Sequence, residues 1–150
     1  MTKYGMAAGL VVLVAATGLV ASPAAAQTKE IATATQHAGL AAKATDLKTA
    51  QQHLHHVINC LVGPSGAGFD ASFGNPCNGQ GNGAIPATST VAKRKPLETA
   101  LGQAQDGVKQ ANLSVALHDA NMAQTTLMGR AKPSKASAKK KAMPAMSHPM

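Results

Sequence analysis

The residues best suited to chemistry form one short cluster, in which three histidines, His53, His55 and His56, are followed closely by Cys60. In an α-helix, at about 100° per residue, His53, His56 and Cys60 share one flank of the helix. Imidazoles at positions i and i+3 can bind the same transition-metal ion. The spacing therefore predicts a metal site with His53 and His56 as protein ligands.

The same pattern leaves other roles open. A loop folded against the helix could add a third ligand, such as Asp70 or a backbone carbonyl, and reduced Cys60 and Cys77 would complete a tetrahedral zinc set with the two histidines. Alternatively, the histidines cap the last carbonyls of the helix, whose negative end favours a partly protonated imidazole. His37 falls on the flank of His55, about five turns away in a continuous helix.

The two cysteines, Cys60 and Cys77, are 17 residues apart and are the only ones in the chain. A disulfide is the simplest state for two cysteines in an oxidising compartment, and closing a loop of this size stabilises a fold by about 3 kcal/mol. We expect the disulfide to hold the glycine-rich segment after Cys60 against the histidine flank.

The first 26 residues have the pattern of a cleaved export signal. Lys3 is followed by an apolar run of 15 residues, Ala7 to Ala21, and then by small residues that end at Ala26. The run is shorter than the roughly 20 residues that a bilayer-spanning helix needs. We therefore expect a periplasmic or secreted protein whose mature chain begins near Gln27.

Hydrophobic spacing predicts an all-α fold, a two-helix antiparallel hairpin over residues 27–129. The first helix is expected over residues 29–62, where four leucines recur every seven residues at positions 40, 47, 54 and 61, and it ends at Gly63-Pro64. The second helix is expected over residues 96–128, starting at Pro96, which suits a first helical position. Between them lies a long loop, residues 63–95, with a compact glycine-rich part around Phe69 and Phe73.

The last eight residues hold four further candidate ligands, Met143, Met146, His148 and Met150. This tail resembles the methionine and histidine segments of periplasmic copper-handling proteins, although it has one such cluster and not a series. Thioether sulfur is a soft ligand that favours Cu(I) and needs no deprotonation. The resemblance, which covers the tail alone, implies copper capture.

Charge separates the body from the tail. Residues 27–129 carry seven basic and six acidic side chains, whereas residues 130–150 carry six basic and no acidic ones. Such a tail lacks the apolar residues needed to fold, and we expect it to be disordered. Its lysines would bind anionic membrane or cell-surface polymers weakly, and export argues against nucleic acid as a partner. Because a two-helix hairpin has a thin core, Leu113 and Leu117 on the opposite face would be covered either by a second copy of the chain, in a homodimer, or by the long loop folding over them.

No complete catalytic set is present: the chain lacks a nucleophile elbow, a zincin motif, a Walker loop and a redox pair of cysteines. The sequence therefore predicts a small exported helical protein, not an enzyme, that binds or buffers a transition metal of the copper or zinc class. The alternative is a structural or interaction module whose cationic arm tethers it to the cell surface.

Overall fold

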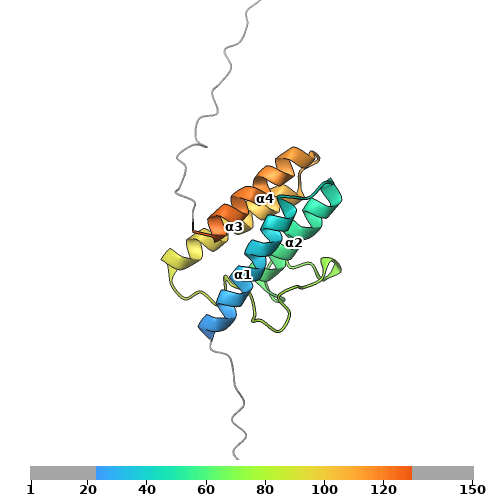
Figure 1. The fold of residues 1–150 in the computed structure, drawn as a ribbon. Helices are drawn as coiled ribbons and strands as arrows, with labels where there is room; N and C mark the ends of the chain where they lie inside the picture. Colours follow the sequence, from blue (N-terminus) through green and yellow to red (C-terminus); the bar gives the residue numbers. More distant parts are fainter. Residues whose placement is uncertain (1–22, 130–150) are drawn as a thin grey trace, which may run out of the picture.

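A computed structural model describes residues 23–129, with their side chains from residue 27 onward, and this part of the chain contains helices and no strand. The elements are α1 (Pro23–Ala41), α2 (Leu47–Val62), a short 3-10 helix (Ala71–Phe73), α3 (Val91–Val108) and α4 (Leu113–Leu127). The four α-helices pack as a bundle, with α1 beside α2 and α4, and α3 beside α4 and α2 (Figure 1). The all-α class is confirmed, but the two-helix hairpin is wrong.

The first predicted helix, residues 29–62, is two helices. α1 ends at Ala41, a short turn follows, and α2 begins after Asp46, whose carboxylate accepts hydrogen bonds from the backbone N–H and the hydroxyl of Thr49. This N-cap satisfies a backbone donor that the first turn of a helix leaves unpaired. Because the turn interrupts the leucine repeat, Leu40 is 43% exposed, whereas Leu54 and Leu61 are buried in the core.

The second predicted helix, residues 96–128, is also divided. α3 begins at Val91, with Thr90 as its N-cap residue, so Pro96 lies inside the helix and not at its first position. α3 ends at Val108, and Asn112 caps the start of α4 by accepting hydrogen bonds from the N–H groups of Ser114 and Val115. The connection after α2 therefore ends at residue 90 and not at residue 95.

The core is built largely from small residues, which allows the helices to approach one another closely. Leu54, Val57 and Leu61 of α2 are fully buried against alanines of the other helices, among them Ala34, Ala38, Ala100, Ala104, Ala120 and Ala123. Gly107 of α3 shows how tight this packing is, because a Cβ there would lie 2.6 Å from Leu54 Cδ1. Leu113 and Leu117 are each partly buried within the single chain. The dimer remains a prediction.

The connection between α2 and α3 returns to the end of α2 and pairs with it. Ala84 and Ile85 donate backbone hydrogen bonds to the carbonyls of Cys60 and Leu61. The predicted disulfide between Cys60 and Cys77 is confirmed, with 5.3 Å between the two Cα atoms. Gly63 has φ +72°, and a Cβ there would collide with the Asn82 carbonyl.

None of the described helices is long and apolar enough to cross a bilayer.

Candidate metal centre

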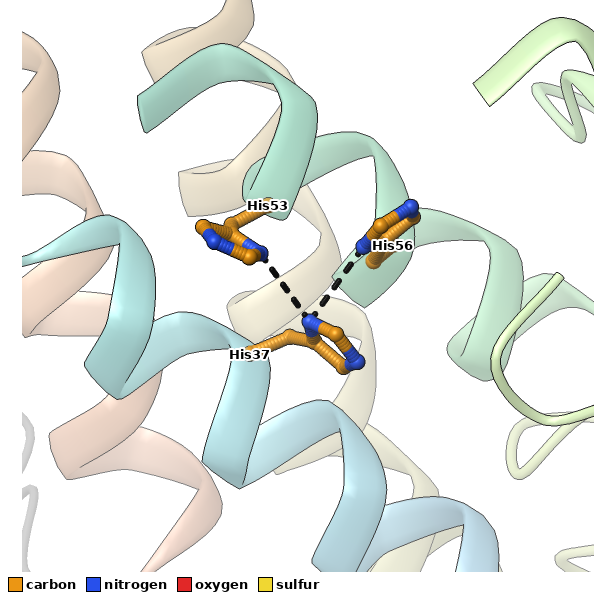
Figure 2. A group of neighbouring side chains, drawn as sticks. All are labelled: His37, His53 and His56. Carbon is orange, nitrogen blue, oxygen red and sulfur yellow. Dashed lines mark hydrogen bonds between the residues drawn. The ribbon is translucent and has the colours of Figure 1, made fainter. Parts of the chain in front are cut away.

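The turn between α1 and α2 brings histidines from two helices together. Because residues 42–46 reverse the chain direction, α1 and α2 lie side by side, and His37 on α1 faces His53 and His56 on α2 (Figures 1 and 2). His53 and His56 are one helical turn apart, so their rings project from the same flank of α2. All three rings are partly buried.

The three rings converge through their Nδ1 atoms. The His37 Nδ1 lies 3.1 Å from the Nδ1 of His53 and 3.3 Å from the Nδ1 of His56. One potential ligand atom from each ring lies within 4.8 Å of the others. Tetrahedral coordination with metal–nitrogen bonds of 2.0–2.1 Å places ligand nitrogens about 3.3 Å apart. The two short separations are therefore close to two edges of a tetrahedral metal site.

A backbone carbonyl determines the tautomer of His56. Its Nε2 lies 2.7 Å from the Phe73 carbonyl oxygen, which can only accept a hydrogen bond, so the Nε2 carries the proton. In the neutral ring the Nδ1 of His56 then presents a lone pair towards His37. A hydrogen bond from the remote ring nitrogen to a carbonyl is the usual way in which proteins orient a metal-binding histidine.

Hydrogen bonds between neutral rings cannot satisfy both short N···N contacts of the His37 Nδ1 at once. If the His37 Nδ1 donates its proton to His56, that nitrogen has no lone pair left to accept from His53. If it accepts a proton from His53, then two lone pairs face each other between His37 and His56. Neutral rings can thus form one good hydrogen bond across the two N···N contacts. A metal cation would use the lone pairs of all three nitrogens at once.

Electrostatics keeps the rings of His37 and His53 neutral near pH 7. Burial, followed by the charges of the neighbouring His56 and His53, lowers the pKa of His37 from 6.5 to about 4. Burial, followed by the nearby His56, also lowers the pKa of His53. Metal ions bind the unprotonated nitrogen of imidazole. These two rings therefore offer their lone pairs without first releasing protons.

The loop whose Phe73 carbonyl bonds His56 is held in place by Asn59, which is fully buried on α2 and acts as a clamp. The Asn59 amide donates to the carbonyls of Asp70 and Gly74, at 2.8 and 2.6 Å, and its oxygen accepts from the Asp70 N–H at 2.9 Å. The clamp thus holds both ends of the 3-10 helix that carries Phe73. The disulfide from Cys60, the next residue, ties the following segment to the same end of α2.

His55 does not belong to the cluster. Its ring stacks on Phe73, with 3.6 Å between ring centroids and an interplanar angle of 5°. Burial lowers the pKa of His55, whereas the negative charge of Asp70 acts in the opposite direction. The stack is a further contact between α2 and the Phe73 loop, in addition to those of His56 and Asn59.

Several predicted partners are absent from the cluster. Asp70 is not a ligand, because its carboxylate caps the 3-10 helix by accepting from the N–H and hydroxyl of Ser72. The alternative zinc set is wrong, because Cys60 and Cys77 are bonded to each other. The rings of His53 and His56 contact His37 and the Phe73 loop and not the last carbonyls of α2.

The structure brings His53 and His56 together and adds His37, which a continuous helix would have kept about five turns away. The missed signal is Asp46, an N-cap residue directly before Leu47, which marks a helix start within the predicted helix. The remaining predicted ligands, Met143, Met146, His148 and Met150, lie outside the described residues.

Comparison of the chain with protein-family models, with curated proteins and with solved structures finds no match. Function therefore has to be inferred from the geometry of the cluster itself.

Proposed function

We propose that this protein is an exported binder or buffer of a transition-metal ion of the copper or zinc class, with His37, His53 and His56 as the ligands in its helical body. The convergence of three imidazole nitrogens, with separations of 3.1 and 3.3 Å from the His37 Nδ1, carries the proposal. Imidazole binds copper and zinc well. The disulfide between Cys60 and Cys77 is consistent with an oxidising compartment such as the periplasm.

Three nitrogen ligands suit a site that exchanges its metal. Structural zinc sites are usually closed by four protein ligands, whereas three protein ligands leave a position for water or an incoming group. The cluster of described residues contains no carboxylate or thiolate. The ion would therefore keep its full positive charge, which favours the transfer of the ion to an anionic or thiolate acceptor over permanent retention.

The tail supplies the second part of the proposal. Met143, Met146, His148 and Met150 would capture Cu(I) through soft ligands, and the three-histidine cluster would then hold the ion in the body. The chain would in that case have two binding elements, one with thioethers and one with imidazoles only. The first would favour Cu(I), whereas the second would also bind Zn(II) and Cu(II).

Metal titration of the purified protein tests the body site. The protein would be titrated with Zn(II), Cu(II) and Cu(I) against a competing chelator of known affinity, alongside His37→Ala and a matched control, His118→Ala. His118 is exposed on α4 and outside the cluster. We expect one Zn(II) per chain, an affinity at least 100-fold weaker in His37→Ala, and no change in His118→Ala. Equal Zn(II) affinity in the three proteins would refute the body site.

The tail is tested separately. A chain that ends at Gly129 should keep the Zn(II) site and lose a Cu(I) site, because its four tail ligands are gone. If Cu(I) stoichiometry and affinity are unchanged by this truncation, the tail has no part in copper capture.

The alternative function, a cationic arm on a helical module, depends on the basic residues of the segment 130–141, which lie outside the described residues. No described contact favours it over metal binding. It remains a prediction, and unchanged binding of anionic vesicles at low salt after removal of residues 130–141 would eliminate it.

A further inference from the structure

Glu30 is the least ordinary buried group in the described part of the chain. It lies in α1, its side chain is 1% exposed, and it is one of the largest fully buried side chains. Its Oε1 accepts a hydrogen bond from the Gly83 N–H at 2.7 Å, but its Oε2 is buried and has no partner. An unpartnered carboxylate oxygen inside a protein is strongly unfavourable and needs an explanation.

The surroundings of Glu30 hold no cation among the described residues. The segment packed over it, residues 76–88, contains no charged side chain, and the neighbouring Lys29 is exposed. Gly81 lies directly against the carboxylate, because a Cβ there would be 2.7 Å from Oε1 and 3.2 Å from Oε2. The Glu30 backbone carbonyl also faces the Cys77 sulfur, at 3.9 Å. The carboxylate is thus enclosed by neutral groups.

Predicted processing of the chain would create a cation close to Glu30. Hydrolysis of the Ala26–Gln27 peptide bond by a signal peptidase consumes one water, leaves a carboxylate on Ala26 and leaves an α-ammonium on Gln27. Glu30 follows Gln27 by three residues. At the start of a helix, a glutamate three residues after the first position can turn back to bond that residue's backbone nitrogen, as in the capping box.

Contacts already present place Gln27 and Glu30 on the same side of α1. The Gln27 side-chain amide bonds the Thr88 hydroxyl, and Glu30 bonds Gly83, so both residues face the segment that leads into α3. Removal of residues before Gln27 would also take away the carbonyls that the first N–H groups of the shortened helix use in the longer chain. A carboxylate at this end of a helix is favoured by the helix dipole.

We propose that Glu30 is a receptor for the α-ammonium of Gln27, so that removal of the export signal completes the fold. The new amino terminus would pair with the Glu30 Oε2 and anchor the start of α1 to the Gly81–Gly83 turn. This proposal depends on cleavage after Ala26 and is independent of metal binding. The mature chain retains every core residue among the described side chains, since the first buried member is Ala34 and Ile31 packs against it.

The test compares chains that differ only at the amino terminus. One is the exported protein that begins at Gln27, with its first residue verified by mass, and the other retains Ala25 and Ala26 in front of Gln27. Each is made with Glu30 and with the isosteric Glu30→Gln. Because an N-terminal glutamine can cyclise and lose its amine, the set is repeated with Gln27→Ser, which cannot cyclise.

Titration of the α-amino group by NMR is the main measurement. An ordinary α-amino group has a pKa of about 7.7–8.0. We expect the amine of the mature chain to bind its proton at least tenfold more tightly, and this increase should disappear in Glu30→Gln. The mature chain should also resist urea better than the extended chain, by a tenfold larger folding constant at pH 7, and this difference should be absent from the Glu30→Gln pair.

Two outcomes would overturn the proposal. The first is an α-amino group that titrates in the ordinary range when Glu30 is present. The second is an increase that is the same in the Glu30→Gln chain, because the amine would then be held by another group. Either result would leave Glu30 as a buried carboxyl group that the Gly83 N–H alone stabilises.

Discussion

Lowering the pH from 7 to 4.5 should destabilise the metal-free protein, and His37 should account for much of the loss. The pKa of His37 is lowered to about 4 in the folded protein, first by burial and then by His56 and His53. In the unfolded chain an ordinary histidine titrates near 6.5. Between these values the unfolded state binds a proton that the folded state does not, so stability falls as the pH drops below 6.5.

The size of the effect follows from the two pKa values. Each pKa unit of difference between the folded and unfolded states corresponds to about 1.4 kcal/mol, which would give roughly 3 kcal/mol once the pH reaches 4. His37 is only partly buried, so solvent screens part of this energy. We therefore expect about 1–2 kcal/mol from His37 at pH 4.5. Glu30 acts in the opposite direction near pH 4.5, because burial raises its pKa.

Urea unfolding at pH 7 and pH 4.5, with a chelator present, measures this contribution as a difference between variants. His37→Gln removes the titrating ring and should reduce the pH dependence by about 1–2 kcal/mol. His118→Gln, an exposed site on α4, should keep the full dependence. If wild type and His37→Gln lose equal stability between the two pH values, a lowered His37 pKa is not the cause of the loss.

Two further predictions concern the loop that carries Phe73. Asn59→Ala should cost about 2–4 kcal/mol of unfolding free energy, because it breaks three hydrogen bonds of a buried amide. The control is Asn121→Ala, at an exposed site on α4. Equal urea midpoints for the two variants would show that Asn59 does not hold the loop in place. Replacing Cys60 and Cys77 together by alanine should cost about 3 kcal/mol. The double replacement should also weaken Zn(II) binding about 10–100-fold, because the Phe73 carbonyl that orients His56 is no longer held in place. An unchanged Zn(II) affinity would show that the loop does not support the site.

The helix boundaries show where sequence reasoning failed. Continuous hydrophobic spacing across residues 29–62 and 96–128 suggested two long helices, because the repeat of leucines at positions 40, 47, 54 and 61 is compatible with a single helical face. Yet an N-cap residue, Asp46 or Asn112, lies within each predicted helix, and each one caps a real helix start. Periodicity alone does not show where a chain turns, because the spacing can continue by chance across a short turn.

Only part of the candidate site could be predicted from the sequence. One turn of helix separates His53 from His56, and this local geometry follows from the sequence alone. The place of His37 depends on the turn at residues 42–46, and the role of the Phe73 carbonyl depends on a loop conformation that Asn59 and the disulfide maintain. Neither the turn nor the loop conformation produces a periodic pattern in the sequence.

The amino-acid sequence by itself determined the helical class, the pairing of the only two cysteines, and the shared flank of His53 and His56, because each depends on residue type or on spacing within one helix. The tertiary structure alone decided that four helices form the bundle, that His37 completes the cluster, and that Glu30 is buried with no cation beside it among the described residues. These features depend on which distant segments meet, and that is set by the packing of the whole core and not by any local repeat.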